Sequence, residues 1–157
     1  MSRKVKPCAS ELLLIGMEDA AQWEVDGERL KHVGDKPAGW RQLTAIPNAL
    51  YAFACCGKVF YIGKTTKTLS KRLFGYCNPG KGQATNWKCH QAIKKLVRQG
   101  KTVRIFVLSH TSPLQWGDYP INLAAGLEDA LVCAFKPEWN GKNSQYLTES
   151  QSLEEAS

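Results

Sequence analysis

Two β-prone stretches joined by a short turn constrain the fold of this chain more than any other feature. Residues 49–55 and 58–62 are rich in tyrosine, phenylalanine, valine and isoleucine, and the turn signal Gly57-Lys58 lies between them. Aromatic and β-branched runs separated by a few residues that include glycine are typical of an antiparallel hairpin. The sequence therefore predicts a hairpin, and with it a sheet that the rest of the chain has to cover.

The length of the hairpin loop decides which side chains share a face, because side chains alternate along a strand. A two-residue loop at Cys56-Gly57 would put Tyr51 and Tyr61 on opposite faces. A three-residue loop over residues 55–57 would place Tyr51 directly across from Tyr61. Three-residue loops favour a left-handed residue at their last position, where Gly57 stands, so we predict this second register. Taken alone, the two tyrosines would form an ordinary cross-strand aromatic pair.

Helical patterns surround the hairpin. Apolar residues at helical spacing predict helices over residues 9–22, from Thr68 or Ser70 to about residue 77, and over residues 86–99 and 122–136, with Asn86 and Asn122 as N-caps. One more strand is expected over residues 102–108, followed by a loop over residues 109–120. Residues 23–45 carry turn signals but no clear element. The sequence thus predicts an α+β domain, with a small three-stranded antiparallel sheet flanked by helices.

Charge is segregated along the chain. Residues 46–110 hold twelve Lys and Arg and no Asp or Glu, whereas residues 111–157 hold two basic and seven acidic residues. A long stretch without carboxylates suits a phosphate backbone, because basic side chains displace the counterions condensed on nucleic acid. A merely basic surface is the plainer alternative, but here the bases are interleaved with aromatic residues. We therefore expect a nucleic-acid partner, contacted by Lys71, Lys88, Lys95 and Arg98.

The cysteines and the hydropathy argue against other classes of protein. None of the six cysteines forms a C-x-x-C pair, which argues against structural zinc and favours free buried thiols in a reducing cytoplasm. No apolar stretch approaches the roughly 18 residues that a membrane span requires. We therefore expect no membrane partner.

Acidic residues limit the chemistry that this chain could carry out on a nucleic-acid backbone. Phosphodiester hydrolysis needs a base, a cation that polarises the phosphate, and neutralisation of the developing charge. Two-metal sites need several carboxylates, whereas Glu128, with Asp129 beside it, is the only well-placed acid in the candidate region. The sequence therefore argues for a single divalent ion, bound by Glu128 at the edge of the apolar stripe of its helix. Taken by itself, Glu128 would be a solvated helix residue.

Five more residues suit such a site. Arg72 and Tyr76 are four residues apart and share a helical face, where Arg72 can bind a phosphate and Tyr76 can relay a proton. Lys64 would favour a nearby phenolate, and Gly63 permits a close approach. Asn140 can orient groups at the site or satisfy a loop. Each also has a structural reading, as a surface base, a core aromatic or a loop residue.

The order of these residues resembles the GIY-YIG nuclease family. The likeness is carried by Ala49-Leu50-Tyr51, by Tyr61-Ile62-Gly63, and by the string from Leu127-Glu128 to Trp139-Asn140. It is greatest to the phage endonuclease II group and to GIY-YIG restriction enzymes. It implies that one of the first two tyrosines is the general base and that Glu128 binds the metal. The catalytic residues that the resemblance implies are Tyr51, Tyr61, Arg72, Tyr76, Glu128 and Asn140, with Gly63 in support. Lys64 is the further supporting residue that its position beside Gly63 suggests.

The resemblance also implies a function. It indicates a Mg²⁺-dependent endonuclease that hydrolyses phosphodiester bonds in double-stranded DNA at a single-metal site, with Mn²⁺ able to replace Mg²⁺. A nucleic-acid-binding protein that does not cleave is the alternative on the same scaffold. The chain divides into an N-terminal extension over residues 1–45, for DNA binding or oligomerisation, a GIY-YIG-like core over residues 46–143, and a flexible acidic tail over residues 144–157. Since one site cuts one strand at a time, we expect a homodimer or a higher oligomer.

Overall fold

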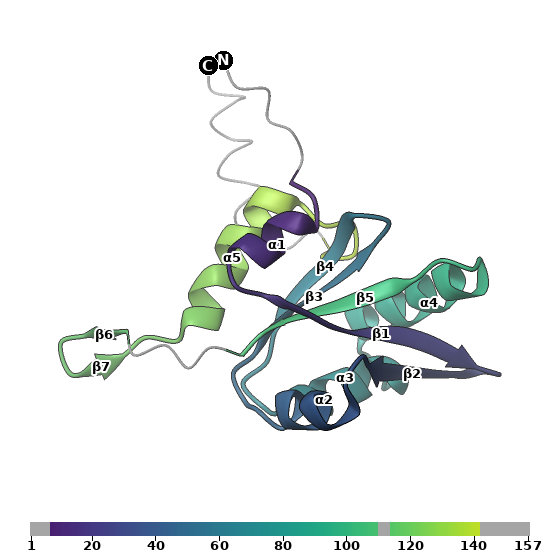
Figure 1. Cartoon of the computed structure of the whole chain (residues 1–157), viewed down its shortest axis with the longest axis horizontal. Coiled ribbons are helices and arrows are strands. Elements are labelled where there is room, and N and C mark those ends of the chain that lie inside the picture. The colour runs from purple at the N-terminus through teal and green to yellow at the C-terminus, as the bar shows by residue number, and fades with distance from the viewer. Residues whose placement is uncertain (1–6, 110–113, 142–157) are drawn as a thin grey trace, which may run out of the picture.

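A single antiparallel sheet organises the protein. The computed structural model describes residues 7–109 and 114–141, so the predicted tail over residues 144–157 lies outside the described residues. Within the described part, five strands lie in the order β2-β1-β5-β3-β4 (Figure 1). The strands are β1 (Glu18–Asp26), β2 (Arg29–Gly34), β3 (Leu50–Cys55), β4 (Lys58–Lys64) and β5 (Val103–Leu108). The predicted α+β class is confirmed, but the sheet has five strands rather than three.

The two additional strands come from the segment predicted to be an N-terminal extension. β1 lies between β2 and β5, and its Trp23 packs edge-on against Phe53 of β3, with 5.4 Å between the ring centroids. Trp23 is 2% exposed, so this part of the chain contributes to the main core. A role of residues 1–45 in DNA binding or oligomerisation stays a prediction.

The prediction of a helix over residues 9–22 is wrong beyond its first part. Helix α1 covers only Ser10–Leu14, and the chain then turns at Gly16, whose φ is 93°. In β1, Ala21 and Trp23 are buried while the residues between and after them are only partly covered. This period of two is the signature of a strand, and it competes with the helical spacing of the preceding leucines.

The hairpin loop is also shorter than predicted. Cys55 pairs with Lys58, which leaves the two residues Cys56 and Gly57 in the turn, with φ values of 53° and 78°. Two consecutive residues with positive φ match the twist of the flanking strands better than the three-residue loop that we predicted. The register with Tyr51 directly across from Tyr61 is therefore wrong.

A β-bulge brings the two tyrosines back to one face. Phe53 pairs with Tyr61 and Tyr51 pairs with Gly63, and the register shifts between these pairs and the turn, where Phe60 is the additional residue of β4. The shift of one residue cancels the effect of the shorter loop. Tyr51 and Tyr61 thus lie on the same face of the sheet, two pairs apart along the ladder.

Helices cover both faces of the sheet (Figure 1). The face that carries the tyrosines is covered by α2 (Pro37–Thr44), α3 (Leu69–Cys77) and α4 (Ala84–Arg98). The other face is covered by α1 and α5 (Leu123–Phe135). The short strands β6 (Gln115–Trp116) and β7 (Tyr119–Pro120) form a second hairpin inside the segment predicted to be a loop. No helix in residues 7–109 or 114–141 is long and apolar enough to cross a membrane.

The later elements follow the sequence more closely. Strand β5 and helix α3 have the predicted bounds to within one residue, and the Thr68 side chain caps α3 by accepting a hydrogen bond from the Lys71 amide. Asn122 caps α5 in the same way, as predicted. Helix α4 begins at Ala84, so the prediction that Asn86 is its N-cap is wrong. All six cysteines are free, but only Cys55 and Cys89 of them are buried.

Candidate active site

An arginine on α3 holds two tyrosine hydroxyls together. The Nε of Arg72 donates to Tyr51 Oη at 2.9 Å, and an Nη of Arg72 donates to Tyr76 Oη at 2.8 Å. The two hydroxyl oxygens are 2.6 Å apart. Because Arg72 and Tyr76 are four residues apart on α3, both side chains reach the same point on β3. The guanidinium also lies over the Tyr76 ring, 4.5 Å from its centroid.

A glycine in β4 makes room for this cluster. Gly63 pairs with Tyr51 across the hairpin, and a Cβ at Gly63 would lie 2.6 Å from the Tyr51 ring. No side chain larger than hydrogen fits at that distance. The ring of Tyr51 therefore crosses the neighbouring strand at Gly63, and its hydroxyl reaches the helix above. Tyr61 lies beside it, 6.1 Å between centroids, and is 7% exposed.

Burial determines the protonation of the two bonded tyrosines. Tyr51 and Tyr76 are both fully buried. Burial raises the pKa of the Tyr51 hydroxyl well above the usual value, and Arg72 and Tyr76 only partly oppose this effect. Burial likewise raises the pKa of Tyr76, with Tyr51 and Tyr61 adding to the shift. Both hydroxyls are therefore neutral near pH 7 and share protons with each other.

Glu128 approaches the same region from the other layer of helices. Its carboxylate lies 4.0 Å from Lys64 Nζ, at the end of β4, and its side chain is 22% exposed. Burial raises the pKa of the Glu128 carboxyl, while the positive charge of Lys64 opposes the shift. Asp129 is exposed on the next position of α5. Glu128 is thus half-buried at the rim of the sheet, where the two layers meet.

Asn140 lies outside the tyrosine cluster, at the outer edge of β4. Its Oδ1 accepts from the Ile62 amide at 2.9 Å, and its Nδ2 donates to the Ile62 carbonyl at 2.7 Å. The amide of Trp139 donates to the Phe60 carbonyl at 2.8 Å. The segment after α5 therefore pairs with the free edge of β4, next to the bulge. Asn140 acts on the strand that carries Tyr61 and Gly63 rather than on the hydroxyls.

The sequence reasoning missed Asn86, which supports the arginine. A second Nη of Arg72 donates to Asn86 Oδ1 at 3.0 Å, and Asn86 Nδ2 donates to Gln83 at 3.0 Å. Gly75 of α3 allows this close approach, since a Cβ there would lie 3.2 Å from Asn86 Nδ2. Asn86 is 6% exposed. The signal in the sequence is a polar residue that continues the buried stripe of Cys89 and Ile93 toward the helix start.

The four predicted DNA-binding residues differ in their surroundings. All four are exposed. The side chain of Lys88 donates to the Glu138 carbonyl at 3.2 Å, and Arg98 pairs with Glu28 at 3.2 Å. Neither Lys71 nor Lys95 makes a side-chain hydrogen bond or ion pair with the described residues. These two cations are therefore the ones most available to a phosphate.

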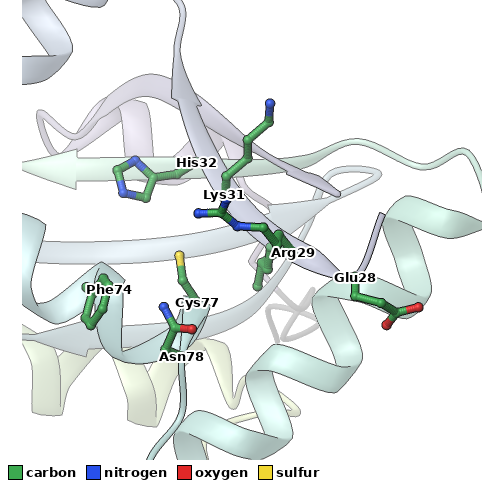
Figure 2. Close-up of a pocket in the computed structure, with 8 residues that line it drawn as sticks. Glu28, Arg29, Lys31, His32, Phe74, Cys77 and Asn78 are labelled. Carbon is green, nitrogen blue, oxygen red and sulfur yellow. The ribbon is translucent and has the colours of Figure 1, made fainter. Parts of the chain in front are cut away.

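A cleft of about 260 Å³ lies between β2 and the end of α3 (Figure 2). Arg29 stands on the β2 side, and Phe74, Cys77 and Asn78 stand on the α3 side. Burial raises the pKa of the Cys77 thiol to about 11, so the thiol is neutral. Phe74 is about 200° round the helix from Arg72. The cleft therefore opens on the opposite side of α3 from the tyrosine cluster.

The single carboxylate of Glu128 suits a hard divalent cation such as Mg²⁺ better than it suits zinc. No group of three His, Cys, Asp or Glu side chains able to hold a metal occurs within residues 7–109 and 114–141. Mg²⁺ keeps several waters and is often bound by one or two carboxylates together with substrate phosphates. The half-buried carboxylate of Glu128 fits that pattern. It does not fit zinc, which takes four protein ligands in structural sites.

Comparison with known proteins places the fold. The chain has a GIY-YIG nuclease-like fold. A mutant of EndoII from bacteriophage T4 matches 85% of this chain and 98% of its own, with 23% identity and a TM-score of 0.58.

Two other solved structures align less well. They are restriction endonuclease HPY188I in complex with product DNA and the GIY-YIG N-terminal endonuclease domain of UvrC from Thermotoga maritima, bound to its catalytic divalent cation. The first has 14% identity and a TM-score of 0.48, over 85% of this chain and 88% of its own. The second has 20% identity and a TM-score of 0.42, over 67% and 97%. No protein-family model matches the sequence, and neither does any curated protein.

Proposed function

We propose that the protein is a metal-dependent endonuclease that hydrolyses phosphodiester bonds in double-stranded DNA. The observation that carries the proposal is Arg72, which donates to the hydroxyls of Tyr51 and Tyr76 at 2.9 and 2.8 Å. The half-buried Glu128, 4.0 Å from Lys64 at the end of β4, supplies a carboxylate for the metal. The fold likeness to EndoII and the order of the motif residues support it. A protein that binds nucleic acid without cleaving it is the alternative. Such a non-cleaving protein would have no need of an arginine held between two buried tyrosine hydroxyls.

Arg72 is assigned to the phosphate. A guanidinium has five N–H donors, and three of those of Arg72 bind Tyr51, Tyr76 and Asn86. Two donors remain, which is the number that a bidentate contact to phosphate oxygens requires. Asn86 and the hydroxyls fix the plane of the guanidinium before DNA arrives. This arrangement lowers the entropic cost of binding the phosphate.

Tyr51 is assigned as the general base. The charge of Arg72, 2.9 Å away, stabilises a phenolate at Tyr51, and the Tyr76 hydroxyl can donate to the same oxygen. Tyr51 is fully buried, so the attacking water has to gain access to its hydroxyl when DNA binds. Tyr61 packs against Tyr51 and keeps the ring in place.

Glu128 is assigned as the ligand of one divalent ion, Mg²⁺ or Mn²⁺. Such an ion, when bound, neutralises charge on the phosphate and on the leaving oxygen. Lys64, 4.0 Å from the carboxylate, favours the ionised form of Glu128 and so opposes the rise in pKa that burial causes. Lys64 also adds positive charge at the point where the DNA backbone passes. Asn140 holds β4, and with it Tyr61 and Gly63, in position.

A paired assay on Glu128→Gln tests the proposal. We expect plasmid cleavage in Mg²⁺ to be lost and a gel shift with the same DNA to be retained, because the substitution removes one negative charge and leaves the basic surface intact. EDTA should abolish cleavage by the unmodified protein, and added Mg²⁺ should restore it. Asp129→Asn is the matched control, because Asp129 is about 100° round the helix and exposed.

Two results would count against the proposal. Cleavage by Glu128→Gln at the rate of the unmodified protein would remove the metal assignment. DNA binding without any cleavage by the unmodified protein, in Mg²⁺ or Mn²⁺, would favour the non-cleaving alternative.

A further inference from the structure

Trp87 is a large aromatic side chain left half-exposed near the start of α4. It is 54% exposed. Its indole ring stacks on the imidazole of His90, with 5.7 Å between the centroids and 18° between the planes. His90 therefore covers one face of the indole, and much of the remaining surface is open to solvent. A single exposed tryptophan needs no explanation by itself, so its surroundings decide whether it has a role.

His90 fixes the orientation of this stack. The imidazole is buried, and its Nδ1 donates to the Tyr76 carbonyl at 2.7 Å, because a carbonyl oxygen can only accept. A buried ring that is bonded in this way does not turn freely. The indole that rests on it is held in one orientation before any partner arrives. An aromatic ring that is already oriented loses less conformational entropy on binding.

Two contacts tie the stack to the helix that carries Arg72. Asn86, the residue before Trp87, accepts a hydrogen bond from Arg72 at 3.0 Å. His90 bonds to the carbonyl of Tyr76, which follows Arg72 by four residues on α3. Trp87 is therefore held beside Arg72, about 1.5 Å further along the axis of α4 than Asn86. A DNA strand whose phosphate meets Arg72 brings a neighbouring nucleotide to the indole.

The surroundings of Trp87 suit a nucleic-acid strand better than a protein surface. Trp87 is the one large apolar side chain that α4 exposes, so no apolar patch extends from it. Lys88 is the next residue, and the exposed Lys95 lies two turns further on, about 80° round the helix. No Asp or Glu occurs within residues 46–110, and Glu28 meets α4 only toward its far end, at Lys94 and Arg98. A phosphate backbone is therefore attracted to the turn that carries the indole.

We propose that Trp87 is a stacking platform for a DNA base that has left the duplex beside the phosphate at Arg72. An aromatic ring among basic side chains binds the face of any base. Inside a duplex both faces of a base are covered by its neighbours, so a base reaches the indole only after it leaves the stack. The inference rests on the proposed function for its partner, DNA. It goes further by naming the class of substrate, which is DNA with an unpaired or easily unpaired base.

A platform of this kind makes affinity depend on base pairing. Extrusion of a base costs least when the base has no partner in the opposite strand. A duplex with a single-base bulge should therefore bind more tightly than the fully paired duplex of the same sequence. Stacking of one base on an aromatic side chain changes affinity by about fivefold to 150-fold. Both effects are measured as binding, so neither requires cleavage.

Fluorescence anisotropy in EDTA tests the preference on a short bulged duplex and its paired counterpart. We expect the unmodified protein to bind the bulged duplex about tenfold more tightly. Trp87→Leu still covers His90 but offers no aromatic face, so it should lose about fivefold or more in affinity for bulged DNA, whereas Trp87→Phe should keep most of it. Trp116→Ala is the matched control, because Trp116 is 79% exposed but lies on β6, and it should change neither affinity. Circular dichroism confirms that each variant is folded.

A photo-cross-link tests the contact itself. A 5-iodouracil at the bulge should cross-link to Trp87 under ultraviolet light, and the same base paired in the duplex should cross-link much less, with mass spectrometry identifying the residue. Equal affinity for the two duplexes would overturn the inference. So would bulged-DNA affinity that Trp87→Leu leaves unchanged, or a cross-link from the bulge to another residue. Each of these results leaves the proposed function in place, because cleavage of paired DNA does not depend on it, whereas failure to bind any DNA would overturn both.

Discussion

Gly63 shows at the scale of one residue how tightly the tyrosine cluster is packed. The Tyr51 ring crosses β4 at this point, and a methyl group would lie 2.6 Å from both its Cζ and its hydroxyl oxygen. Gly63→Ala should therefore push Tyr51 away from Arg72. We expect the free energy of unfolding to fall by about 1–3 kcal/mol and DNA cleavage to be lost. Chemical denaturation and plasmid cleavage of the same preparation measure both effects.

Gly39→Ala is the control for this substitution. A Cβ at Gly39, exposed on α2, meets nothing closer than 3.8 Å. It should leave cleavage unchanged and raise stability by up to about 1 kcal/mol, because alanine loses less backbone entropy in a helix than glycine does. If both variants behave alike, the tight contact with Tyr51 does not govern the site.

The buried hydroxyl of Tyr51 predicts the pH dependence of cleavage. A phenolate base works only when ionised, and burial raises the pKa of Tyr51 well above the usual tyrosine value. The ionised fraction, and with it kcat/KM, should therefore increase about tenfold per pH unit from pH 7 to pH 9. Initial rates across that range at constant Mg²⁺ provide the measurement. A flat profile over these two units would remove Tyr51 as the base.

At this scale, spacing along one helix could be predicted and contacts between helices could not. The four-residue spacing places Arg72 and Tyr76 on the same face of α3 whatever the rest of the fold does. Asn86 contacts Arg72 only because Gly75 lets α4 come close, and no pattern in the sequence reports that approach. From the sequence, Asn86 was therefore predicted to be a helix N-cap, a common role of an asparagine near a helix start.

Among the elements, β4 depends most on a distant segment. It is an edge strand, and the side chain of Asn140 pairs with both backbone groups of Ile62. Asn140→Ala should leave these two groups without partners and lower the free energy of unfolding by about 1–3 kcal/mol. It should also increase the hydrogen-exchange rate of the Ile62 amide. Loss of cleavage in step with these changes would indicate that Asn140 positions the strand.

Asn140→Asp separates the two hydrogen bonds. An aspartate can still accept from the Ile62 amide, but it repels the Ile62 carbonyl instead of donating to it. The Ile62 amide should therefore stay protected from exchange. The free energy of unfolding should fall by no more than it does in Asn140→Ala. An alanine variant as stable and as protected as the unmodified protein would contradict the structural role.

The bounds of α3, β5 and α5 followed from local signals, and the pairing between the strands did not. Asn122 and Thr68 mark helix starts that the chain uses, because a cap acts within three residues. The register of the hairpin depends on a two-residue turn and on the bulge at Phe60. The bulge faces Trp139, whose ring lies 4.9 Å from that of Phe60. A contact between residues so far apart in the chain leaves no trace in the alternation of β4.

For the whole molecule, the segregation of charge along the sequence becomes a segregation between layers. The basic helices α3 and α4 cover the face that carries the tyrosines, while α1 and α5, which hold no Lys or Arg, cover the other. On the proposed function, a DNA backbone would therefore be attracted to the side where Arg72 lies. The composition of residues 46–110 was enough to predict a basic surface, but not its place opposite an apolar one.

The salt dependence of DNA binding tests this arrangement. Affinity should fall steeply as salt rises, because each phosphate contact releases counterions. In a plot of the logarithm of the binding constant against the logarithm of the salt concentration, each contact removed should make the slope less steep by about 0.9. Lys71→Ala and Lys95→Ala should each reduce the slope by about that amount, since both cations are exposed. Arg98→Ala should reduce it less, because Glu28 already neutralises that guanidinium at 3.2 Å. Fluorescence anisotropy at several salt concentrations measures all three slopes on one labelled duplex. Equal slopes in the three variants and the unmodified protein would mean that DNA does not bind across α3 and α4.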